Sequence, residues 1–466
     1  MSPDAAASAD LRPQGFDEHA VAAWLSAPPH LTGDYAEDRR RFPPYWNGCD
    51  DLIRRCPPKP QRSPAEAEMA QALLAAAREQ RERFLRAHVE ALYDELTGDR
   101  ARFVRLEDLV LAAAAAVPGL VPTALQVAAE AELLQRDKDG VEIDQGIFIA
   151  HVLASATAGR HLCHAMLLPR AETADRLKEL DANGSVDFGT VSVVRRGKAA
   201  VVTATNARFL NAEDNSTLDA MEIAVDIAIL DPKTDIAVLR GGVVEHPKYR
   251  GRRLFGAGIN LTQLYRGQIP YLWFLRRDLG FVHKFFRGVA RPELLPDDVH
   301  GTAIEKPWIA AVDGFAIGGH CQILLTMDYV LAAHDAFMTL PARKEGIIPG
   351  AANLRLPRFT GDRIARQAIQ YERKLHCDSP EGRLICDEIA PAGDMDRALD
   401  RVIAGLTSSG AVSATSNRRA LRIGAEPLDL FRQYFSAYAR DQAYCHFSPG
   451  LIANLEREWN AHNRKV

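Results

Sequence analysis

Strand and helix patterns alternate along the C-terminal three-fifths of the chain, and this alternation constrains the fold more than any other feature. Two runs, VDFGTVSVVRRG and KAAVVTAT, begin near residue 186 and predict two β-strands joined by a glycine-containing turn. A helical pattern follows over about 215–229, and strand patterns follow over 236–241 and 308–314. Strands that alternate with helices indicate an α/β layered domain with a largely parallel sheet.

The residues before this region have mostly helical patterns. Residues 1–62 are rich in proline, alanine and charge, and they predict an extended, loop-rich arm. Ser63 then has the features of a helix N-cap, with a proline after it and a glutamate three residues on, and Gly98 ends the pattern. Further helical patterns cover 105–117, 123–136 and 143–167. We therefore expect two domains, a mostly helical one over 1–185 and an α/β one over 186–466.

Composition and charge exclude several functional classes. A length of 466 residues suits two domains, and 47% apolar with 25% charged residues is typical of a soluble globular protein. The net charge of -4 argues against a general nucleic-acid binder, which would have a basic face. The seven cysteines form no C-x-x-C pair, so neither a disulfide framework nor a zinc ribbon is indicated. The chain has no signal-peptide pattern and no apolar stretch of about 18 residues, which predicts a cytoplasmic protein.

His161 and His164 in the segment RHLCHAML are a candidate metal pair. Their spacing of three places both side chains on one face of a helix, as metal ligands require. No carboxylate or third ligand lies near them in the sequence. The pattern therefore favours packing or surface histidines, with a metal site as the alternative.

Two predicted strand–turn–helix units contain glycine turns that are candidates for binding a carbonyl oxygen. The first unit contains RLFGAGIN at 253–260, and the second contains GFAIGGHCQ at 314–322. A glycine turn that opens a helix leaves backbone N–H groups free. Two such groups aimed at one point form an oxyanion hole for a thioester carbonyl. Either turn alone is more often a relief of crowding between a strand and a helix.

In this order and about sixty residues apart, the two turns resemble those of the enoyl-CoA hydratase/isomerase (crotonase) superfamily. NARFLNA at 206–212 resembles the family segment N-x-P-x-x-x-N-A-L, and PARKEGIIPG at 341–350 resembles P-E-x-x-x-G-x-x-P-G. The resemblance covers roughly 186–450. It implies a crotonase-like α/β domain of spiralling ββα repeats, preceded by the helical domain. It also implies that the oxyanion N–H groups belong to Ile259 and Gly319.

The sequence departs from the hydratases of this superfamily at both catalytic glutamates. Gln322 occupies the place of one, three residues after the second oxyanion glycine, and Ala342 occupies the place of the other. A glutamine amide does not accept a proton at neutral pH, and alanine has no acid–base chemistry. We therefore expect the chain to stabilise a thioester enolate without hydrating a double bond. A substrate with an acidic α-proton, such as an arylacetyl-CoA, suits such a site.

Within the superfamily, three segments resemble the cofactor-independent dioxygenases that act on arylacetyl-CoA thioesters. These segments are RRLFGAGINL, IPYLWFLRRDLG and HGTAIEKPWIAAVDGFAIGGHCQILL. The resemblance implies that the enolate reacts with O2 held in an apolar pocket, that CoA leaves, and that no metal or flavin takes part. The sequence agrees, because it has neither 2-His-1-carboxylate spacing nor a dinucleotide fingerprint. The resemblance also implies a homo-oligomer, a trimer or a dimer of trimers, with no nucleic-acid or membrane partner.

The same resemblance implies roles for several polar residues of the acyl pocket. Gln322 would hydrogen-bond the substrate, Glu213 would bind a ring hydroxyl, and Arg277 would reach the pocket from the next helix. As alternatives, Glu213 is a carboxylate at a helix start, and Arg277 is a surface charge paired with Asp278. Cys321, beside Gln322, is expected to be a small buried hydrophobe and not a nucleophile.

A basic cluster near the first turn is the candidate site for the 3′-phosphoadenosine end of CoA. Its members are Lys248, Arg250, Arg252 and Arg253. Arg253 stands where the family places a cation near the CoA phosphates, and Ala257 of the A-G pair would contact the CoA moiety. A solvated loop is the alternative for these residues.

Two other functions remain open. One is an acyl-CoA hydrolase or isomerase on the same scaffold, which would need no O2. The other is a non-catalytic CoA-binding subunit, with the N-terminal helices as its partner surface. The polar residues at pocket positions favour an enzyme, because a pocket without chemistry would not require them.

Overall fold

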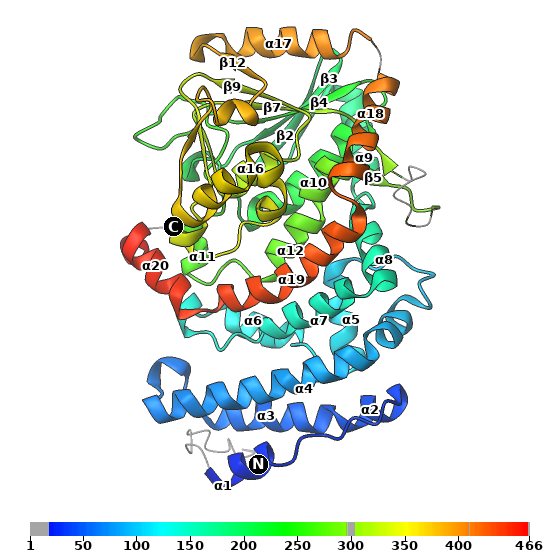
Figure 1. Ribbon diagram of the computed structural model, residues 1–466, viewed down its shortest axis with the longest axis vertical. Helices are drawn as coiled ribbons and strands as arrows, with labels where there is room; N and C mark the ends of the chain where they lie inside the picture. Colours follow the sequence, from blue (N-terminus) through cyan, green and yellow to red (C-terminus); the bar gives the residue numbers. More distant parts are fainter. Residues whose placement is uncertain (1–17, 295, 297–302, 410, 465–466) are drawn as a thin grey trace, which may run out of the picture.

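The computed structural model describes residues 18–294, 296, 303–409 and 411–464. A twisted sheet with its helices occupies one end of the molecule, and the long helices α3 and α4 occupy the other, with α5, α7 and α8 between them (Figure 1). The N-terminal helices are α1 (Glu18–Leu25), α2 (Tyr35–Arg41), α3 (Pro43–Arg55), α4 (Pro64–Thr97), α5 (Leu106–Ala116), α6 (Ala124–Ala131), α7 (Ile143–Ala154), α8 (Ala156–Leu167) and α9 (Thr173–Asn183).

Helix α4 has the ends that the sequence predicts. The Ser63 side chain accepts from the Glu66 N–H while Glu66 accepts from the Ser63 N–H, and Gly98 ends the helix in the left-handed region at φ 63°. The single helix predicted over 143–167 is two helices. Ser155 has an extended backbone, ends α7 and caps the start of α8.

The extended arm predicted for residues 1–62 is wrong for the part that the structure describes, because α1, α2 and α3 lie there. Pro43 and Pro44 occupy the first positions of α3, where a missing N–H costs nothing. Phe42 and Trp46 are fully buried and pack on Phe84 of α4. Burial of these aromatic rings orders the segment. Residues 1–17 lie outside the described part.

A seven-stranded sheet has the order β1-β2-β3-β4-β7-β9-β12. Its strands are β1 (Ser185–Asp187), β2 (Val191–Arg196), β3 (Ala199–Ala204), β4 (Ile236–Gly241), β7 (Trp308–Val312), β9 (Tyr329–Ala333) and β12 (Glu388–Ala390). The first three strands are antiparallel, and β3, β4, β7, β9 and β12 run parallel. The predicted largely parallel α/β sheet is confirmed, with three strands in place of two at its start.

Smaller strands and further helices complete the α/β part. The strands are β5 (Val289–Ala290), β6 (Ala303–Ile304), β8 (Phe315–Ile317), β10 (Phe337–Thr339) and β11 (Leu375–His376). The helices are α10 (Asn215–Leu230), α11 (Leu261–Tyr265), α12 (Leu272–Leu279), α13 (Phe281–Arg287), α14 (Gly319–Leu324), α15 (Ala342–Glu345), α16 (Ala352–Tyr371), α17 (Met395–Leu406), α18 (Ala411–Ala425), α19 (Leu428–His446) and α20 (Pro449–Trp459).

Two hydrophobic cores meet at helix α12, which contributes buried residues to both. One core lies around the sheet, and the other joins the N-terminal helices to α12 and α19. Helix α19 runs along α7, between the helical part and the α/β part (Figure 1). A Cβ on Gly146 of α7 would lie 2.6 Å from the Ala443 Cβ, so the two helices touch at their backbones. The domain division at residue 185 coincides with the start of β1 and stays a prediction.

His161 and His164 are packing residues in this core. Both are buried, and the Phe103 ring lies 4.6 Å from each of their rings. His161 bonds the Tyr93 hydroxyl at 2.7 Å through Nδ1, and His164 Nε2 lies 3.3 Å from the Arg291 carbonyl oxygen. In the described ranges no group of three or more His, Cys, Asp or Glu side chains could hold a metal ion.

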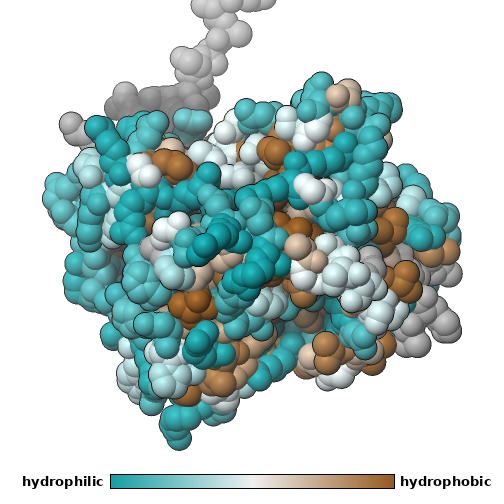
Figure 2. Space-filling model, turned by 90° about the horizontal axis from the view of Figure 1, so that it is seen from above, coloured by the Kyte–Doolittle hydropathy of each residue, from teal (hydrophilic) through white to brown (hydrophobic). Residues whose placement is uncertain are grey.

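The surface at the sheet end is mostly hydrophilic, with hydrophobic side chains in small separate groups, as on ordinary protein surfaces (Figure 2). Among the helices of the described part of the chain, none has the length and apolar character needed to cross a membrane.

Candidate active site

The two predicted glycine turns lie against each other in the structure. A Cβ on Gly258 would lie 2.8 Å from the Ile317 carbonyl oxygen and 3.2 Å from the Gly319 nitrogen. Gly258 has φ 78°, which glycine adopts without strain. The strand predicted over 308–314 is β7, the helix after the second turn is α14, and the short strand β8 lies within the predicted turn. The strand predicted before the first turn, over 236–241, is β4, and isolated bridges lie between it and α11.

The backbone N–H groups of Ile259 and Gly319 are available to a ligand. The Glu213 N–H donates to the Gly258 carbonyl at 2.7 Å, and the Asn260 N–H donates to the Glu213 carbonyl at 2.8 Å. This parallel bridge turns the Ile259 N–H away from Glu213. Gly319 is the first residue of α14, so its N–H has no acceptor within the helix. Neither N–H donates a hydrogen bond to any residue that the structure describes.

Arg277 joins the polar residues that the sequence assigned to the acyl pocket. Its Nε and Nη2 donate to the two Glu213 carboxylate oxygens at 2.9 and 3.0 Å. Its Nη1 donates to Asp278 at 2.6 Å and to Oε1 of Gln322 at 3.0 Å. Nη2 also donates to the Gly319 carbonyl at 2.8 Å. All five N–H groups of the guanidinium are therefore in use.

The Arg277 cluster is fully enclosed. Arg277 is 3% exposed, so the surface-charge alternative does not hold. Burial alone would lower the pKa of Arg277, but the charges of Glu213 and Asp278 outweigh burial and raise it above its ordinary value. Burial raises the pKa of Asp278, although Arg277 opposes that rise. A Cβ on Gly319 would lie 2.3 Å from Oε2 of Glu213, so only glycine admits this carboxylate.

His320 supports the first oxyanion turn, and the sequence offered no signal for this role. Burial lowers the pKa of His320, which keeps the ring neutral, and Nδ1 accepts a hydrogen bond from the Gly258 N–H at 3.0 Å. Cys321, next to it, is buried, and burial raises the pKa of its thiol to about 12. The prediction that Cys321 is a buried hydrophobe is confirmed.

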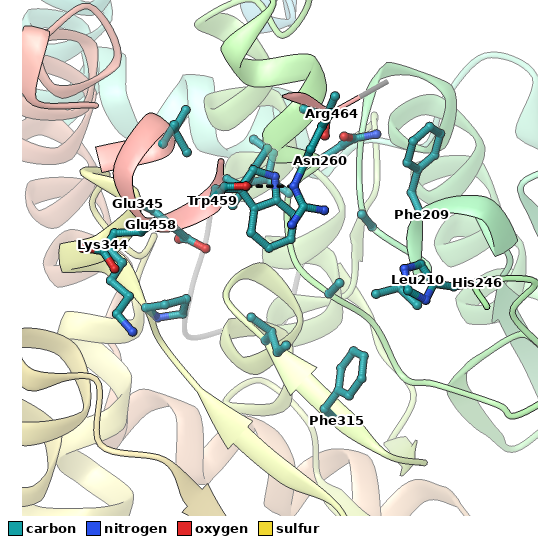
Figure 3. Close-up of a pocket in the computed structure, with 18 of the residues that line it drawn as sticks. Phe209, Leu210, His246, Asn260, Phe315, Lys344, Glu345, Glu458, Trp459 and Arg464 are labelled. Carbon is teal, nitrogen blue, oxygen red and sulfur yellow. Dashed lines mark hydrogen bonds between the residues drawn. The ribbon is translucent and has the colours of Figure 1, made fainter. Parts of the chain in front are cut away.

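Two cavities adjoin the oxyanion turns. The outer cavity has a volume of about 590 Å³. Lys344, Glu345 and Glu458 lie on one side of it, and Phe209, Leu210 and His246 on the other (Figure 3). The inner cavity is about 30 Å³ and contains the Arg277 cluster among apolar walls. Ile259 and Glu345 line both cavities, so the passage between them lies at the first oxyanion residue.

Glu345 is a site residue that sequence reasoning missed. It ends α15, three residues after the buried Ala342 that replaces a hydratase glutamate, and it is 8% exposed. A Cβ on Gly318 would lie 3.7 and 3.9 Å from its carboxylate oxygens. Burial raises the pKa of Glu345 to about 7, and the charge of Glu372 adds to the rise. Helical spacing from Ala342 was the available signal, because residues three apart share a helix face.

The predicted CoA-binding residues divide between two places. Ala257 lines the outer cavity, and the Lys248 ammonium lies 5.1 Å from the ring of Tyr249, which also lines it. Arg253 lines a separate cavity of about 250 Å³ that also contains Arg252.

Three cations that sequence reasoning did not select line the outer cavity, namely Arg208, Lys344 and Arg464. Arg464 is held by the Trp459 carbonyl, to which its Nε donates at 2.8 Å (Figure 3). These residues come from segments far apart in the chain. No local motif could have brought them together.

Comparisons with known proteins agree with this geometry. A model of the enoyl-CoA hydratase/isomerase family matches residues 285–438. A (3,5-dihydroxyphenyl)acetyl-CoA 1,2-dioxygenase from Amycolatopsis orientalis is 47% identical over 407 residues, which cover 87% of this chain and 92% of that protein. A short-chain-enoyl-CoA hydratase from Clostridium acetobutylicum is 26% identical over 52% of this chain and 84% of its own.

Among solved structures, an enoyl-CoA hydratase from Mycobacterium avium subsp. paratuberculosis aligns with 58% of this chain and 98% of its own, at 21% identity and a TM-score of 0.48. The 407 residues matched by the dioxygenase exceed the length of 186–466, so that similarity extends into the N-terminal helices. Such identity over almost the whole of both chains establishes common membership. The chain belongs to the enoyl-CoA hydratase/isomerase (crotonase) superfamily.

Proposed function

We propose that this protein is a dioxygenase that converts (3,5-dihydroxyphenyl)acetyl-CoA and O2 to 3,5-dihydroxyphenylglyoxylate and CoA. The observation that carries the proposal is the 47% identity to a dioxygenase of that substrate over 87% of the chain. The site supports it, because free N–H groups at a thioester position adjoin a polar inner cavity with apolar walls. Such an enzyme would supply an arylglyoxylate for antibiotic biosynthesis.

The Ile259 and Gly319 N–H groups bind the thioester oxygen and stabilise the enolate that forms when the α-proton leaves. The enolate carbon transfers an electron to O2, and a peroxide forms at Cα. The peroxide attacks the thioester carbonyl, and CoA leaves as the thiol. The remaining Cα–H bond then breaks and its proton leaves, while its electron pair forms the C=O bond of the ketone and the O–O bond cleaves to give a carboxylate in place of the thioester. The two oxygen atoms gained come from O2, and the enolate supplies the electrons without a metal or a flavin.

Arg277 acts through its neighbours in this proposal. Because its five N–H groups are occupied, it holds the Glu213 carboxylate and the Gln322 amide in fixed positions. Glu213 keeps free lone pairs that accept a hydrogen bond from a ring hydroxyl. Gln322 offers its oxygen to Arg277, so its NH2 group is left to donate to the substrate. The inner cavity has a volume of about 30 Å³, so the proposal requires its walls to move apart when the ring enters.

The outer cavity holds the CoA moiety in this proposal. Its volume of about 590 Å³ suits a long ligand, and the cations Arg208, Lys344 and Arg464 face the phosphates. Ala257 and Lys248 contact the adenosine end from the first turn and the loop before it. Arg253 keeps its assignment to the CoA phosphates as a prediction, although it lines another cavity.

An oxygen-uptake assay with (3,5-dihydroxyphenyl)acetyl-CoA tests the function. We expect one O2 to be consumed for each CoA released, and no CoA to be released under nitrogen. CoA release under nitrogen would indicate a hydrolase instead. Binding of the thioester without turnover in air would indicate a non-catalytic subunit.

Turnover is expected to survive dialysis against EDTA without loss. The enolate is itself the electron donor to O2, so the proposed chemistry needs no metal. Metal analysis of the dialysed protein, with the oxygen-uptake rate measured on the same sample, checks this. Loss of turnover that iron restores would contradict the proposal. It would favour the alternative in which His161 and His164 bind a metal ion.

The protein is expected to form a trimer or a dimer of trimers, as crotonases commonly do. Light scattering at micromolar concentration should give three or six times the 51.3 kDa of one chain. A monomeric mass would contradict this expectation. The cytoplasmic location expected from the sequence stays a prediction.

A further inference from the structure

Glu345 lies at the junction of the outer and inner cavities. In the proposed function the Ile259 and Gly319 N–H groups bind the thioester carbonyl, the aryl ring enters the inner cavity and CoA lies in the outer one, so the α-carbon would lie at this junction. Glu345 and Ile259 are the two residues shared by the linings of both cavities. The Glu345 carboxylate also lies beside the Gly318 backbone, one residue before the second oxyanion N–H.

The Glu345 carboxylate differs from the other carboxylates of the inner cavity in having no partner. Arg277 donates to both oxygens of Glu213 and to one oxygen of Asp278, which directs these two carboxylates toward the guanidinium. His320 accepts the Gly258 N–H through Nδ1. Within the described residues the Glu345 carboxylate makes no hydrogen bond or ion pair, and it lines the cavities.

We propose that Glu345 is the base that removes the α-proton of the arylacetyl-CoA. In this step the Cα–H bond breaks and its electron pair forms the C=C bond of the enolate. The carbonyl π electrons move to the thioester oxygen, which the Ile259 and Gly319 N–H groups bind. The proton goes to a Glu345 oxygen, and no oxidant takes part in this step. The inference rests on the proposed function, because it deepens the first step of that reaction.

The electrostatic surroundings of Glu345 suit a base that works near neutral pH. Its pKa of about 7 lies close to the value at which general-base catalysis is most efficient. The charged groups that line the cavities around it are Arg208, Lys344, Glu458 and Arg464 on the outer side, and Glu213, Arg277 and Asp278 on the inner side. The negative charge of Glu372, at the end of α16, also raises the pKa of Glu345. Glu372 itself pairs with Arg343 at 3.2 Å and Lys344 at 2.7 Å.

Exchange of the α-protons of (3,5-dihydroxyphenyl)acetyl-CoA in D2O under nitrogen isolates this step from the reaction with O2. We expect the wild-type protein to exchange them and Glu345→Gln to exchange them about a hundredfold more slowly, the lower end of general-base effects. Glu345→Asp should recover part of the rate. Asp362→Asn, which removes an exposed carboxylate on α16, should exchange at the wild-type rate.

The pH dependence of kcat/KM distinguishes a base from a residue that only supports the fold, because a purely structural role of Glu345 would not change it. A base must be deprotonated to act, so kcat/KM should rise with pH through about 7 in the wild type, and Glu345→Gln should lack this rise. Glu372→Gln leaves Glu345 in place and removes a neighbouring negative charge, while it frees the cations of Arg343 and Lys344. Both changes lower the pKa of Glu345 and should move the rise to lower pH.

Each outcome decides between the two proposals. Wild-type exchange under nitrogen without O2 consumption in air would overturn the dioxygenase and leave the base assignment standing. Exchange by Glu345→Gln at the wild-type rate, or an unshifted profile in Glu372→Gln, would overturn the base assignment. The Glu372→Gln profile still decides the question if Glu345→Gln does not fold. Absence of any exchange by the wild type would overturn the base assignment as well.

Discussion

Arg277→Met is expected to lower the free energy of unfolding by about 3–5 kcal/mol, the usual cost of removing one partner from a buried ion pair. The substitution keeps the length of the side chain but leaves Glu213 and Asp278 buried without their cation. It also removes the donor to Gln322 and to the Gly319 carbonyl. Denaturant unfolding followed by circular dichroism measures the loss, and oxygen uptake should fall with it.

Arg276→Met is the matched control for that substitution. Arg276 is the preceding residue of α12, but its side chain is 23% exposed and pairs with Glu107 and Asp219 near the surface. Exposed pairs contribute about 0–1 kcal/mol, so this variant should unfold close to the wild type. Adding Glu213→Gln to Arg277→Met should restore part of the lost stability, because it removes one unpaired charge. Equal losses in the two single variants would contradict a buried role for Arg277.

Gln322→Glu is expected to lower turnover by about a thousandfold. It replaces a neutral amide that has an NH2 donor by a carboxylate, whose negative charge lies next to an enolate that is itself negative. Repulsion between charges about 4 Å apart at an effective dielectric of about 20 is on the order of 4 kcal/mol, and about 1.36 kcal/mol corresponds to a factor of ten in rate. Arg277 cannot neutralise the new charge, because its N–H groups already bind two carboxylates.

Gln322→Ala should cost less, about one or two factors of ten, because it removes a hydrogen bond without adding a charge. The order of the two variants is therefore the decisive result, measured as oxygen uptake at saturating thioester. A glutamate variant as active as the wild type, or one that hydrates an enoyl-CoA, would mean that Gln322 is not a donor in this site.

Features set by local chemistry could be predicted from the sequence. The Ser63 capping box and the Gly98 stop depend on residues within one turn of a helix, and strand β4 begins and ends at the predicted residues. The glycine turns at 258 and 318 were also visible, because a left-handed backbone restricts the residue type wherever the rest of the chain lies. The loss of both hydratase glutamates followed from the same motifs.

Features set by contacts between distant segments needed the tertiary structure. Helix α3 forms because Phe42 and Trp46 are buried against α4, which no pattern within 1–62 revealed. Arg253 was assigned to the CoA site by its position in a motif and stays a prediction there, but only the structure shows that it lines a different cavity from Ala257. Side-chain direction depends on how loops pack, and the local sequence does not fix that packing.

The acyl site shows the same division most clearly. The sequence by itself determined which residue types are present, including Glu213, Arg277 and Gln322 near two oxyanion turns. The tertiary structure decided that the Arg277 guanidinium holds both Glu213 and Gln322, and that Glu345 has no such partner among the residues that the structure describes. Ion pairs and burial depend on groups that the chain brings together from far apart. For this reason the sequence around Glu345 did not indicate that its carboxylate is buried and lines two cavities; only the tertiary structure shows this.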